Sequence, residues 1–262
     1  MNMVDVIRKK MPPELIYFIR KRLQGKDYGI QIYDKNDANT YCEDSLLTYG
    51  RNLQFLAEPK FYTAYNDAIK DKLFVSPYIR WRLHVLCWAG SVAARLEGDF
   101  VECGVNKGFD SKIIMDYLDF KKLDKTYYLL DTFEGLCEEL LTNEEKALGR
   151  KGGGYASCID IVSKVFDECK NVRIIKGRIP DTLPNVDSKK IAFLHIDMNC
   201  VVPEIEAMKY FYDKLSKGAI VVFDDYGQDA YVEQKKAHDL FARSKGVNIL
   251  TLPTGQGLMI KL

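Results

Sequence analysis

Short β-branched runs alternate with segments of helical spacing after Gly98, and this alternation restricts the possible fold more than any other feature of the chain. Strands that alternate with helices form βαβ units, in which helices cover both faces of a mostly parallel sheet. Seven runs are predicted to be strands: Phe100–Cys103, Tyr127–Leu130, Val172–Ile175, Ile191–Ile196, Ile220–Phe223, Val247–Leu250 and Leu258–Lys261. Helices are predicted around Phe109–Phe120, Tyr155–Lys170, Glu204–Leu215 and Asp229–Ser244.

The last two predicted strands need a different connection, because only Thr251–Gly257 joins them. This segment is too short for a crossover helix, so the two strands should form an antiparallel hairpin. The predicted fold is therefore α/β, a Rossmann-like doubly wound sheet of seven strands that is mostly parallel and ends in an antiparallel hairpin strand.

The residues before Gly98 have a mainly helical pattern. Helical segments are predicted at Glu14–Leu23, Leu46–Leu73 and Tyr78–Leu96, whereas Gly25–Glu43 is polar and irregular. The chain is thus expected to divide into a helical N-terminal region, residues 1–97, and an α/β domain, residues 98–262. The apolar helices of the first region make it a candidate for dimerisation and for one wall of a binding pocket.

Charge and cysteine usage exclude several classes of protein. Lys and Arg number 38 against 37 Asp and Glu, so a net charge of +1 argues against nucleic acid or an anionic membrane as partner. The longest uncharged apolar stretches are too short for a membrane span, and the first residues do not resemble a signal peptide. Seven cysteines without a CxxC pair indicate free thiols and a cytoplasmic protein.

Candidate ligand-binding residues follow the first two strands of the sheet. Ligands of open α/β sheets bind beyond the carboxyl ends of the strands. The turn after the first strand contains Gly104 and Gly108, which are four residues apart and do not make the GxGxxG pattern of a dinucleotide site. Glu102 beside Gly104 suits a cationic ligand better than a phosphate, although a plain tight turn is the alternative. Asp131 ends the second strand, where an acidic residue accepts ribose hydroxyls, unless it only caps a turn.

Carboxylates also end the fourth and fifth strands. Asp197 follows one strand, and Asp224 and Asp225 follow the next. Three carboxylates brought close together require a cation or a shared proton, and hard oxygen ligands suit Mg²⁺. The alternative is that these residues cap turns and helices. His195 lies within the fourth strand and is either a general base or a core histidine with a satisfied hydrogen bond.

Four segments together carry a resemblance to a known family: Gly98–Gly104, Leu130–Leu136, His195–Asp197 and Phe223–Gly227. With the closing Leu252–Leu258, the chain from Pro77 onward resembles the macrocin O-methyltransferase family, class I enzymes that depend on S-adenosylmethionine. The resemblance implies Mg²⁺-assisted methylation of a hydroxyl on a sugar or similar acceptor, either of a natural product or of a capsular polysaccharide or other glycan. It makes residues 98–262 a domain that binds S-adenosylmethionine.

The resemblance also assigns roles to individual residues. Asp197, Asp224 and Asp225 would hold Mg²⁺, and Asp197 or His195 would act as the catalytic base. The residues implied in cofactor binding are Glu102, Cys103, Gly104, Asn106, Asp131, Thr132, Phe133, Arg178 and Ile179. Arg80 and Arg82 either bind an acidic acceptor or are exposed helix charges.

Two segments depart from the family or are peculiar to this chain. Met198–Glu204 stands where the family often has a Tyr-Glu-Ser-Thr-like stretch, although Asn199 can still offer an oxygen to a metal. Cys137–Tyr155 begins with acidic residues and ends near Gly152-Gly153-Gly154. It is either a lid over the acceptor or an ordinary surface insertion.

Two other functions stay open on the sequence. A nicotinamide-dependent oxidoreductase would use the strand, the glycine turn and the later Asp131, but lacks the third glycine of its motif. A non-catalytic partner protein could keep a methyltransferase fold. For the methyltransferase, the expected partners are a small-molecule or glycan acceptor and a second copy of the chain.

Overall fold

The computed structural model describes residues 40–74 and 76–262. The predicted helix Glu14–Leu23 and most of the irregular segment Gly25–Glu43 lie outside the described residues. By its internal contacts the chain separates into two units, Met1–Cys42 with Leu47–Asn52, and Glu43–Leu46 with Leu53–Leu262. The second unit holds the sheet and its helices.

Residues 40–49 form a hairpin, which corrects the irregular prediction for the end of Gly25–Glu43 and part of the helical prediction for Leu46–Leu73. Strand β1 is Thr40–Glu43 and strand β2 is Leu46–Tyr49. Asp44 and Ser45 join them with φ angles of 49° and 62°, the left-handed conformation of a tight hairpin turn. The β-forming residues on both sides of this turn outweigh the helical spacing of the apolar positions. The predicted helix begins only later, at Pro59.

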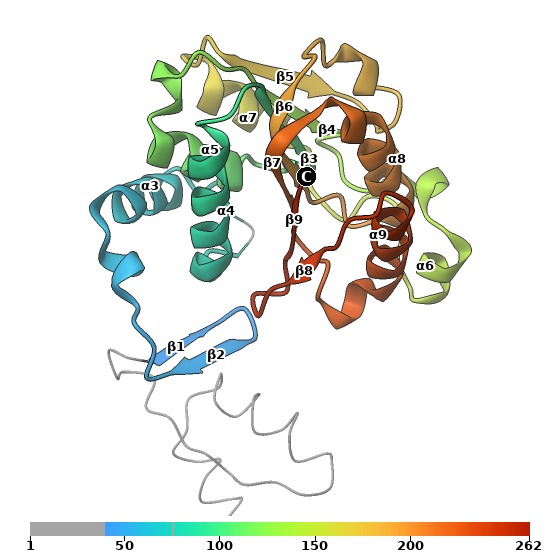
Figure 1. Cartoon of the computed structure of the whole chain (residues 1–262), viewed down its shortest axis with the longest axis horizontal. Helices are drawn as coiled ribbons and strands as arrows, with labels where there is room; N and C mark the ends of the chain where they lie inside the picture. Colours follow the sequence, from blue (N-terminus) through green and yellow to red (C-terminus); the bar gives the residue numbers. More distant parts are fainter. Residues whose placement is uncertain (1–39, 75) are drawn as a thin grey trace, which may run out of the picture. The chain divides into compact units, whose positions relative to one another are not determined.

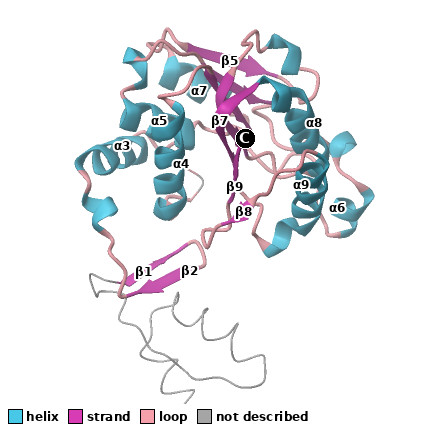
Figure 2. Ribbon diagram, viewed as in Figure 1, coloured by secondary structure: helices cyan, strands magenta, loops and turns pink. Residues whose placement is uncertain are grey.

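Seven strands form one sheet in the order β5–β4–β3–β6–β7–β9–β8 (Figures 1 and 2). The strands are β3 Asp99–Cys103, β4 Tyr127–Asp131, β5 Val172–Lys176, β6 Ile191–Ile196, β7 Leu215–Phe223, β8 Leu250–Thr251 and β9 Gly257–Ile260. The first five run parallel, and β9 runs antiparallel to both β7 and β8. The predicted mostly parallel sheet with its closing hairpin is confirmed, although β8 begins at Leu250 rather than Val247.

The helices cover the sheet in two layers. They are α3 Pro59–Lys70, α4 Arg80–Ala93, α5 Phe109–Leu118, α6 Asn143–Ala147, α7 Ile159–Phe166, α8 Val201–Phe211 and α9 Val232–Ser244. Short 3₁₀ turns lie at Gln54–Ala57, Phe120–Lys122, Glu138–Leu140, Leu183–Asn185, Tyr212–Lys214 and Asp229–Tyr231. No helix in this described part of the chain has both the length and the apolar character that a membrane span requires.

Two apolar clusters fill the space between these layers. Alternate residues of each strand point to opposite faces, so Phe100 and Phe193 join the cluster under α3, α4, α5 and α7. Val101 and Leu194, one residue further along each strand, join the cluster under α8 and α9. Helices α3 and α4 therefore share a core with the sheet rather than forming a core of their own.

The strand order reverses between β3 and β6, and this point determines where a ligand can bind. Helix α5 follows β3 on one face, whereas α8 follows β6 on the other face. The turns after these two strands separate at the carboxyl edge of the sheet, which leaves a crevice there.

Candidate active site

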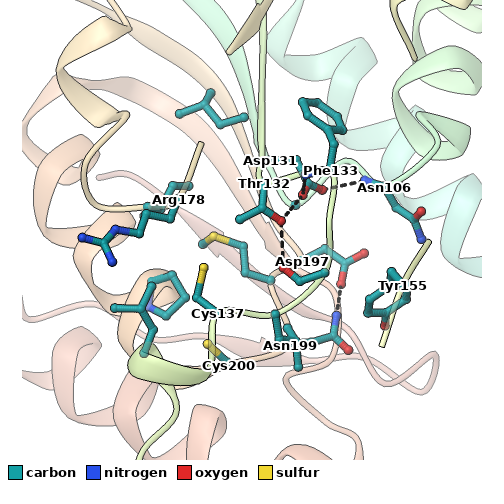
Figure 3. A pocket seen from close by; sticks show the side chains of 18 of the residues that line it. Asn106, Asp131, Thr132, Phe133, Cys137, Tyr155, Arg178, Asp197, Asn199 and Cys200 are labelled. Carbon is teal, nitrogen blue, oxygen red and sulfur yellow. Dashed lines mark hydrogen bonds between the residues drawn. The ribbon is translucent and has the colours of Figure 1, made fainter. Parts of the chain in front are cut away.

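A cavity opens at this edge of the sheet (Figure 3). The turns after β3, β4, β5 and β6 each contribute to its wall. Eight of the residues predicted from the sequence to form a site line this cavity: Gly104, Asn106, Asp131, Thr132, Phe133, Arg178, Ile179 and Asp197. The structure thus brings together, at one place, residues that lie up to 93 positions apart in the chain.

The turn after β3 requires glycine at position 104. Gly104 has φ +92°, and a Cβ atom there would lie 1.9 Å from the carbonyl oxygen of Asp197. Its missing side chain lets the backbone after β3 pass directly beside the backbone after β6. Asn106, two residues later, is also left-handed with φ 48° and faces the cavity.

Asp131 holds the turns after β3 and β4 together. Its Oδ2 accepts hydrogen bonds from the backbone N–H groups of Val105 and Asn106, both at 2.7 Å. Its Oδ1 accepts from the backbone of Phe133 at 2.7 Å and from the Thr132 hydroxyl at 3.2 Å. The backbone bonds fix the carboxylate at the cavity wall, and the longer Thr132 bond is the one a ligand hydroxyl could most easily replace.

Glu102 and Cys103 lie below the cavity and do not line it. Cys103 is buried in the apolar cluster under α8 and α9. Glu102 is also buried, and its carboxylate accepts hydrogen bonds from the hydroxyls of Ser111 and Tyr127. His195 stands opposite Glu102 in the register of β3 and β6, with Nδ1 3.1 Å from Glu102 Oε1. Glu102 therefore has partners inside the protein that the sequence did not reveal.

The metal ligands predicted from the sequence do converge. Asp197, Asp224 and Asp225 each offer an oxygen atom, and these atoms all lie within 4.8 Å of one another. Burial, followed by the charges of Asp224 and Asp225, raises the pKa of Asp197. Burial and Asp224 likewise raise the pKa of Asp225 to about 7. The raised pKa values of Asp197 and Asp225 show that negative charge accumulates at this group of hard oxygens, which fits a divalent cation.

Arg82 supplies positive charge to this carboxylate group. Its Nη1 donates hydrogen bonds to Asp224 and, at 3.4 Å, to Asp225, while its Nε donates to Asp44 at 2.6 Å. The guanidinium is therefore neither an exposed charge nor free for an acidic acceptor, as the two sequence hypotheses supposed. Arg80, on the same helix, pairs with Glu43 instead.

Two further residues around the carboxylates escaped the sequence analysis. Gln256, before β9, is fully buried and donates from Nε2 to Asp224 Oδ1 at 3.2 Å. Asp110, in the first turn of α5, lies within 4.8 Å of Glu102 and His195. Burial, then the charges of Asp224 and Glu102, raises the pKa of Asp110 to about 7. The signal for Gln256 was its place in the closing segment Leu252–Leu258, whereas Asp110 gave no signal.

His195 is fully buried and does not line the cavity. Its Nε2 lies 4.0 Å from Asp224 Oδ1 and has no hydrogen-bond partner among the described residues. Burial alone would lower the pKa of His195, but the hydrogen bond and charge of Glu102, with the charges of Asp110 and Asp224, raise it to about 9. The structure places this histidine behind the carboxylates rather than beside a bound substrate.

The segment Cys137–Tyr155 forms part of the cavity wall. Leu136, Cys137, Leu140 and Tyr155 line the cavity. Leu136 and Gly153 pair as an antiparallel bridge, which brings the two ends of the segment together. The segment thus borders the site, as the lid hypothesis requires and a plain surface insertion does not.

Fold and site together define a class of protein. A seven-stranded sheet with an antiparallel β9 between β7 and β8, and with acidic residues at the carboxyl ends of its strands, has the methyltransferase fold. A solved structure of the O-methyltransferase NovP shares this fold with a TM-score of 0.62 at 22% identity, covering 71% of this chain and 81% of that chain. Residues 81–250 match the model of the macrocin-O-methyltransferase family, and the chain belongs to that family.

Curated relatives are similar over the same region. One is 8-demethyl-8-(2,3-dimethoxy-alpha-L-rhamnosyl)-tetracenomycin-C 4'-O-methyltransferase of Streptomyces olivaceus, 27% identical over 55% of this chain and 59% of that protein. Another is demethyldecarbamoylnovobiocin O-methyltransferase of Streptomyces niveus, 27% identical over 53% of this chain and 57% of that protein. The matched region thus spans less than two thirds of these relatives' length.

Proposed function

We propose that this chain is an S-adenosylmethionine-dependent O-methyltransferase that uses a divalent cation, Mg²⁺, to methylate a hydroxyl of a sugar or similar polar acceptor. The observation that carries the proposal is the position of Asp197, which both lines the cavity and belongs to the carboxylate group with Asp224 and Asp225. The name of the Streptomyces olivaceus relative, which includes a rhamnosyl group, supports a sugar-type acceptor. A capsular or other glycan sugar is the alternative acceptor.

The cavity residues suit S-adenosylmethionine better than a dinucleotide. Asp131 and Thr132 stand where ribose hydroxyls would accept and donate hydrogen bonds, and Phe133, Arg178 and Ile179 would border the adenine side. Acidic residues around the cavity favour a sulfonium cation over a pyrophosphate. Gly104 would let the methionine part approach the backbone closely, whereas Glu102 and Cys103 would support this turn from below.

Asp197 is the proposed base. A divalent cation held by Asp197, Asp224 and Asp225 would act as a Lewis acid and would lower the pKa of an acceptor hydroxyl. The hydroxyl oxygen forms a bond to the methyl carbon as the carbon–sulfur bond breaks, and the hydroxyl proton passes to Asp197. His195, the other predicted base, would instead support Asp224 from the buried side.

The cofactor is tested by thermal unfolding with S-adenosylhomocysteine. We expect the melting temperature to rise by several degrees at saturating ligand, because binding to the folded state alone stabilises it. NAD⁺ in the same assay tests the oxidoreductase alternative. A shift with NAD⁺ and none with S-adenosylhomocysteine would reject the proposed cofactor.

The metal-assisted reaction is tested by methyl transfer to a panel of rhamnosides, nucleotide sugars and glycan fragments. Asp224→Asn should lower the rate by a factor of about 100 or more, because a ligand and a charge are lost at the metal. Asp213→Asn, whose side chain is 82% exposed, is the matched control and should keep full activity. Full activity of Asp224→Asn, or undiminished activity in EDTA, would contradict the metal assignment. Cofactor binding without transfer to any acceptor would support the non-catalytic alternative.

The role of residues 1–97 remains a prediction from the sequence. We propose that this region contributes to acceptor choice and to a dimer. Light scattering at working concentration tests the dimer, and a mass of one chain would reject it.

A further inference from the structure

Asn199 contacts the proposed base through its side chain. Its Nδ2 donates a hydrogen bond to Asp197 Oδ1 at 2.9 Å (Figure 3). This bond occupies one lone pair of Oδ1 and leaves the rest of the Asp197 carboxylate for a cation or a substrate proton. The sequence suggested that Asn199 could give an oxygen to a metal, but its amide presents nitrogen to the carboxylate.

Tyr231 determines which way the Asn199 amide faces. Its hydroxyl donates a hydrogen bond to Asn199 Oδ1 at 2.5 Å. Burial and the charge of Asp225 raise the pKa of Tyr231 to about 12, so the hydroxyl keeps its proton at neutral pH. A permanent donor on Oδ1 keeps Nδ2 on the side of Asp197, because an amide has its acceptor and its donors at opposite ends.

Arg150 holds both of these residues in place. Its guanidinium carbon lies 4.0 Å from the centre of the Tyr231 ring, a cation–π contact. Its Nη1 donates to the backbone carbonyl of Asn199 at 2.9 Å, and its Nη2 donates to that of Ala230 at 2.8 Å. Asn199 has φ 57°, a left-handed conformation that costs free energy for a residue with a side chain. The carbonyl bond from Arg150 helps to fix this backbone.

We propose that Tyr231 and Asn199, braced by Arg150, are positioning residues that orient Asp197 for the cation. Hydrogen bonds from residues behind a ligand determine its orientation, and their loss typically weakens metal binding about 10- to 100-fold. The chain of contacts joins three parts of the fold: Arg150 comes from the segment Cys137–Tyr155, Asn199 from the turn after β6, and Tyr231 from the turn before α9. This inference rests on the proposed metal-binding function of Asp197.

Manganese binding tests the inference without any acceptor. We expect Mn²⁺, followed by calorimetry, to bind the intact protein and to bind Tyr231→Phe about 10-fold more weakly. Asn199→Gly removes the amide but keeps a residue suited to the left-handed backbone, and should weaken binding by at least as much. Tyr210→Phe, in α8 and without a hydrogen bond to the site, is the matched control and should bind Mn²⁺ like the intact protein.

The double variant separates positioning from a general loss of structure. If Tyr231 acts through Asn199, then Tyr231→Phe should have no further effect in the Asn199→Gly background. S-adenosylhomocysteine should bind Tyr231→Phe with unchanged affinity, because Tyr231 does not line the cavity. Additive losses in the double variant, or equal Mn²⁺ affinity of Tyr231→Phe and the intact protein, would overturn the inference. An intact protein that fails to bind Mn²⁺ would overturn the metal assignment of the proposed function and the inference with it.

Discussion

Arg82 brings a positive charge into contact with the carboxylate group. It reaches Asp224 and Asp225 from one nitrogen and Asp44 from another, with its side chain only 11% exposed. A cation bound by the same carboxylates would be repelled by the guanidinium. Asp44 is a further partner of Arg82. The guanidinium would therefore keep an ion pair when its contacts with Asp224 and Asp225 weaken.

Replacing Arg82 with Gln should raise the affinity for a metal and lower the unfolding free energy of the metal-free protein. We expect Mn²⁺ to bind about 10-fold more tightly, about 1.4 kcal/mol, because one nearby positive charge is lost. We expect the metal-free variant to lose about 3 kcal/mol of unfolding free energy, because buried carboxylates lose their partner. Calorimetry and urea unfolding measure the two effects. Arg80→Gln, which removes the pair with Glu43 instead, is the control, and unchanged Mn²⁺ affinity in Arg82→Gln would refute this account of the site.

At Gly104, the addition of a single Cβ atom should lower the stability of the fold. A Cβ there would meet the Asp197 carbonyl oxygen at 1.9 Å, so Gly104→Ala must push apart the turns after β3 and β6. We expect a loss of about 4 kcal/mol or more in urea unfolding. Gly149→Ala isolates the cost of the backbone angle, because Gly149 has φ +87° but open space around it, and should cost about 1 kcal/mol. Similar losses of unfolding free energy in the two variants would mean that the turns after β3 and β6 can move apart at little cost.

At the scale of elements, helix α6 attaches the segment Cys137–Tyr155 to the rest of the domain. Thr142 and Glu145 form a reciprocal capping box at its N-terminus. The same Glu145 is 1% exposed, and its Oε1 accepts a hydrogen bond from the backbone N–H of Val201 at 2.8 Å. One carboxylate therefore caps α6 and also accepts a hydrogen bond from the first backbone N–H group of α8.

Glu145→Ala should loosen this segment selectively. The variant leaves the N–H groups of Thr142 and Val201 without their acceptor, at a cost of about 2–3 kcal/mol. We expect trypsin to cleave faster at Lys146, Arg150 or Lys151 than in the intact protein, as followed by mass spectrometry. Glu144→Ala changes an exposed neighbour on the same helix and should leave the cleavage rate unchanged. Equal rates for both variants would show that Glu145 does not anchor the segment.

The elements of the sheet could be predicted from the sequence because each carries its own signal. Buried parallel strands are short apolar runs, and a loop too short for a helix forces the hairpin of β8 and β9. The strand ends also placed Asp131, Asp197, Asp224 and Asp225 at one edge. Strand β2 was predicted to be helical because its apolar residues also match a helical period, and β1 was included in the polar, irregular segment before it. The left-handed turn at Asp44-Ser45 joins the two as a hairpin.

Contacts between elements could not be predicted in this way. The pair of Glu102 and His195 depends on the register of β3 and β6, which nothing local in either strand reveals. Arg82 lies 142 residues from Asp224, on a helix whose own pattern indicates only which face is apolar. The packing of whole elements brings these side chains together. The same packing buries Glu102 against its partners below the cavity, so that it does not line the cavity wall.

At the scale of the whole molecule, the site makes stability depend on pH. Asp110 and Asp225 have pKa values raised to about 7, mainly by burial, and His195 has a pKa raised to about 9 by its acidic neighbours, which outweigh its burial. Each pKa is higher in the folded protein than in the unfolded chain, so the folded protein binds more protons. The stability that these protons contribute is present at low pH and is lost as the pH rises through each folded pKa.

We therefore expect the metal-free protein in EDTA to lose unfolding free energy steadily between about pH 5 and pH 9 in urea titrations. Saturating Mg²⁺ should oppose this loss, because the ionised carboxylates that destabilise the metal-free protein are the form that binds a cation. The stabilisation by Mg²⁺ should thus grow with pH. Asp224→Asn should reduce both the pH dependence in EDTA and the stabilisation by Mg²⁺, since Asp224 contributes to all three raised pKa values and to the metal site. Stability in EDTA that is flat or rises over this range would show that the buried carboxylates and His195 keep ordinary pKa values.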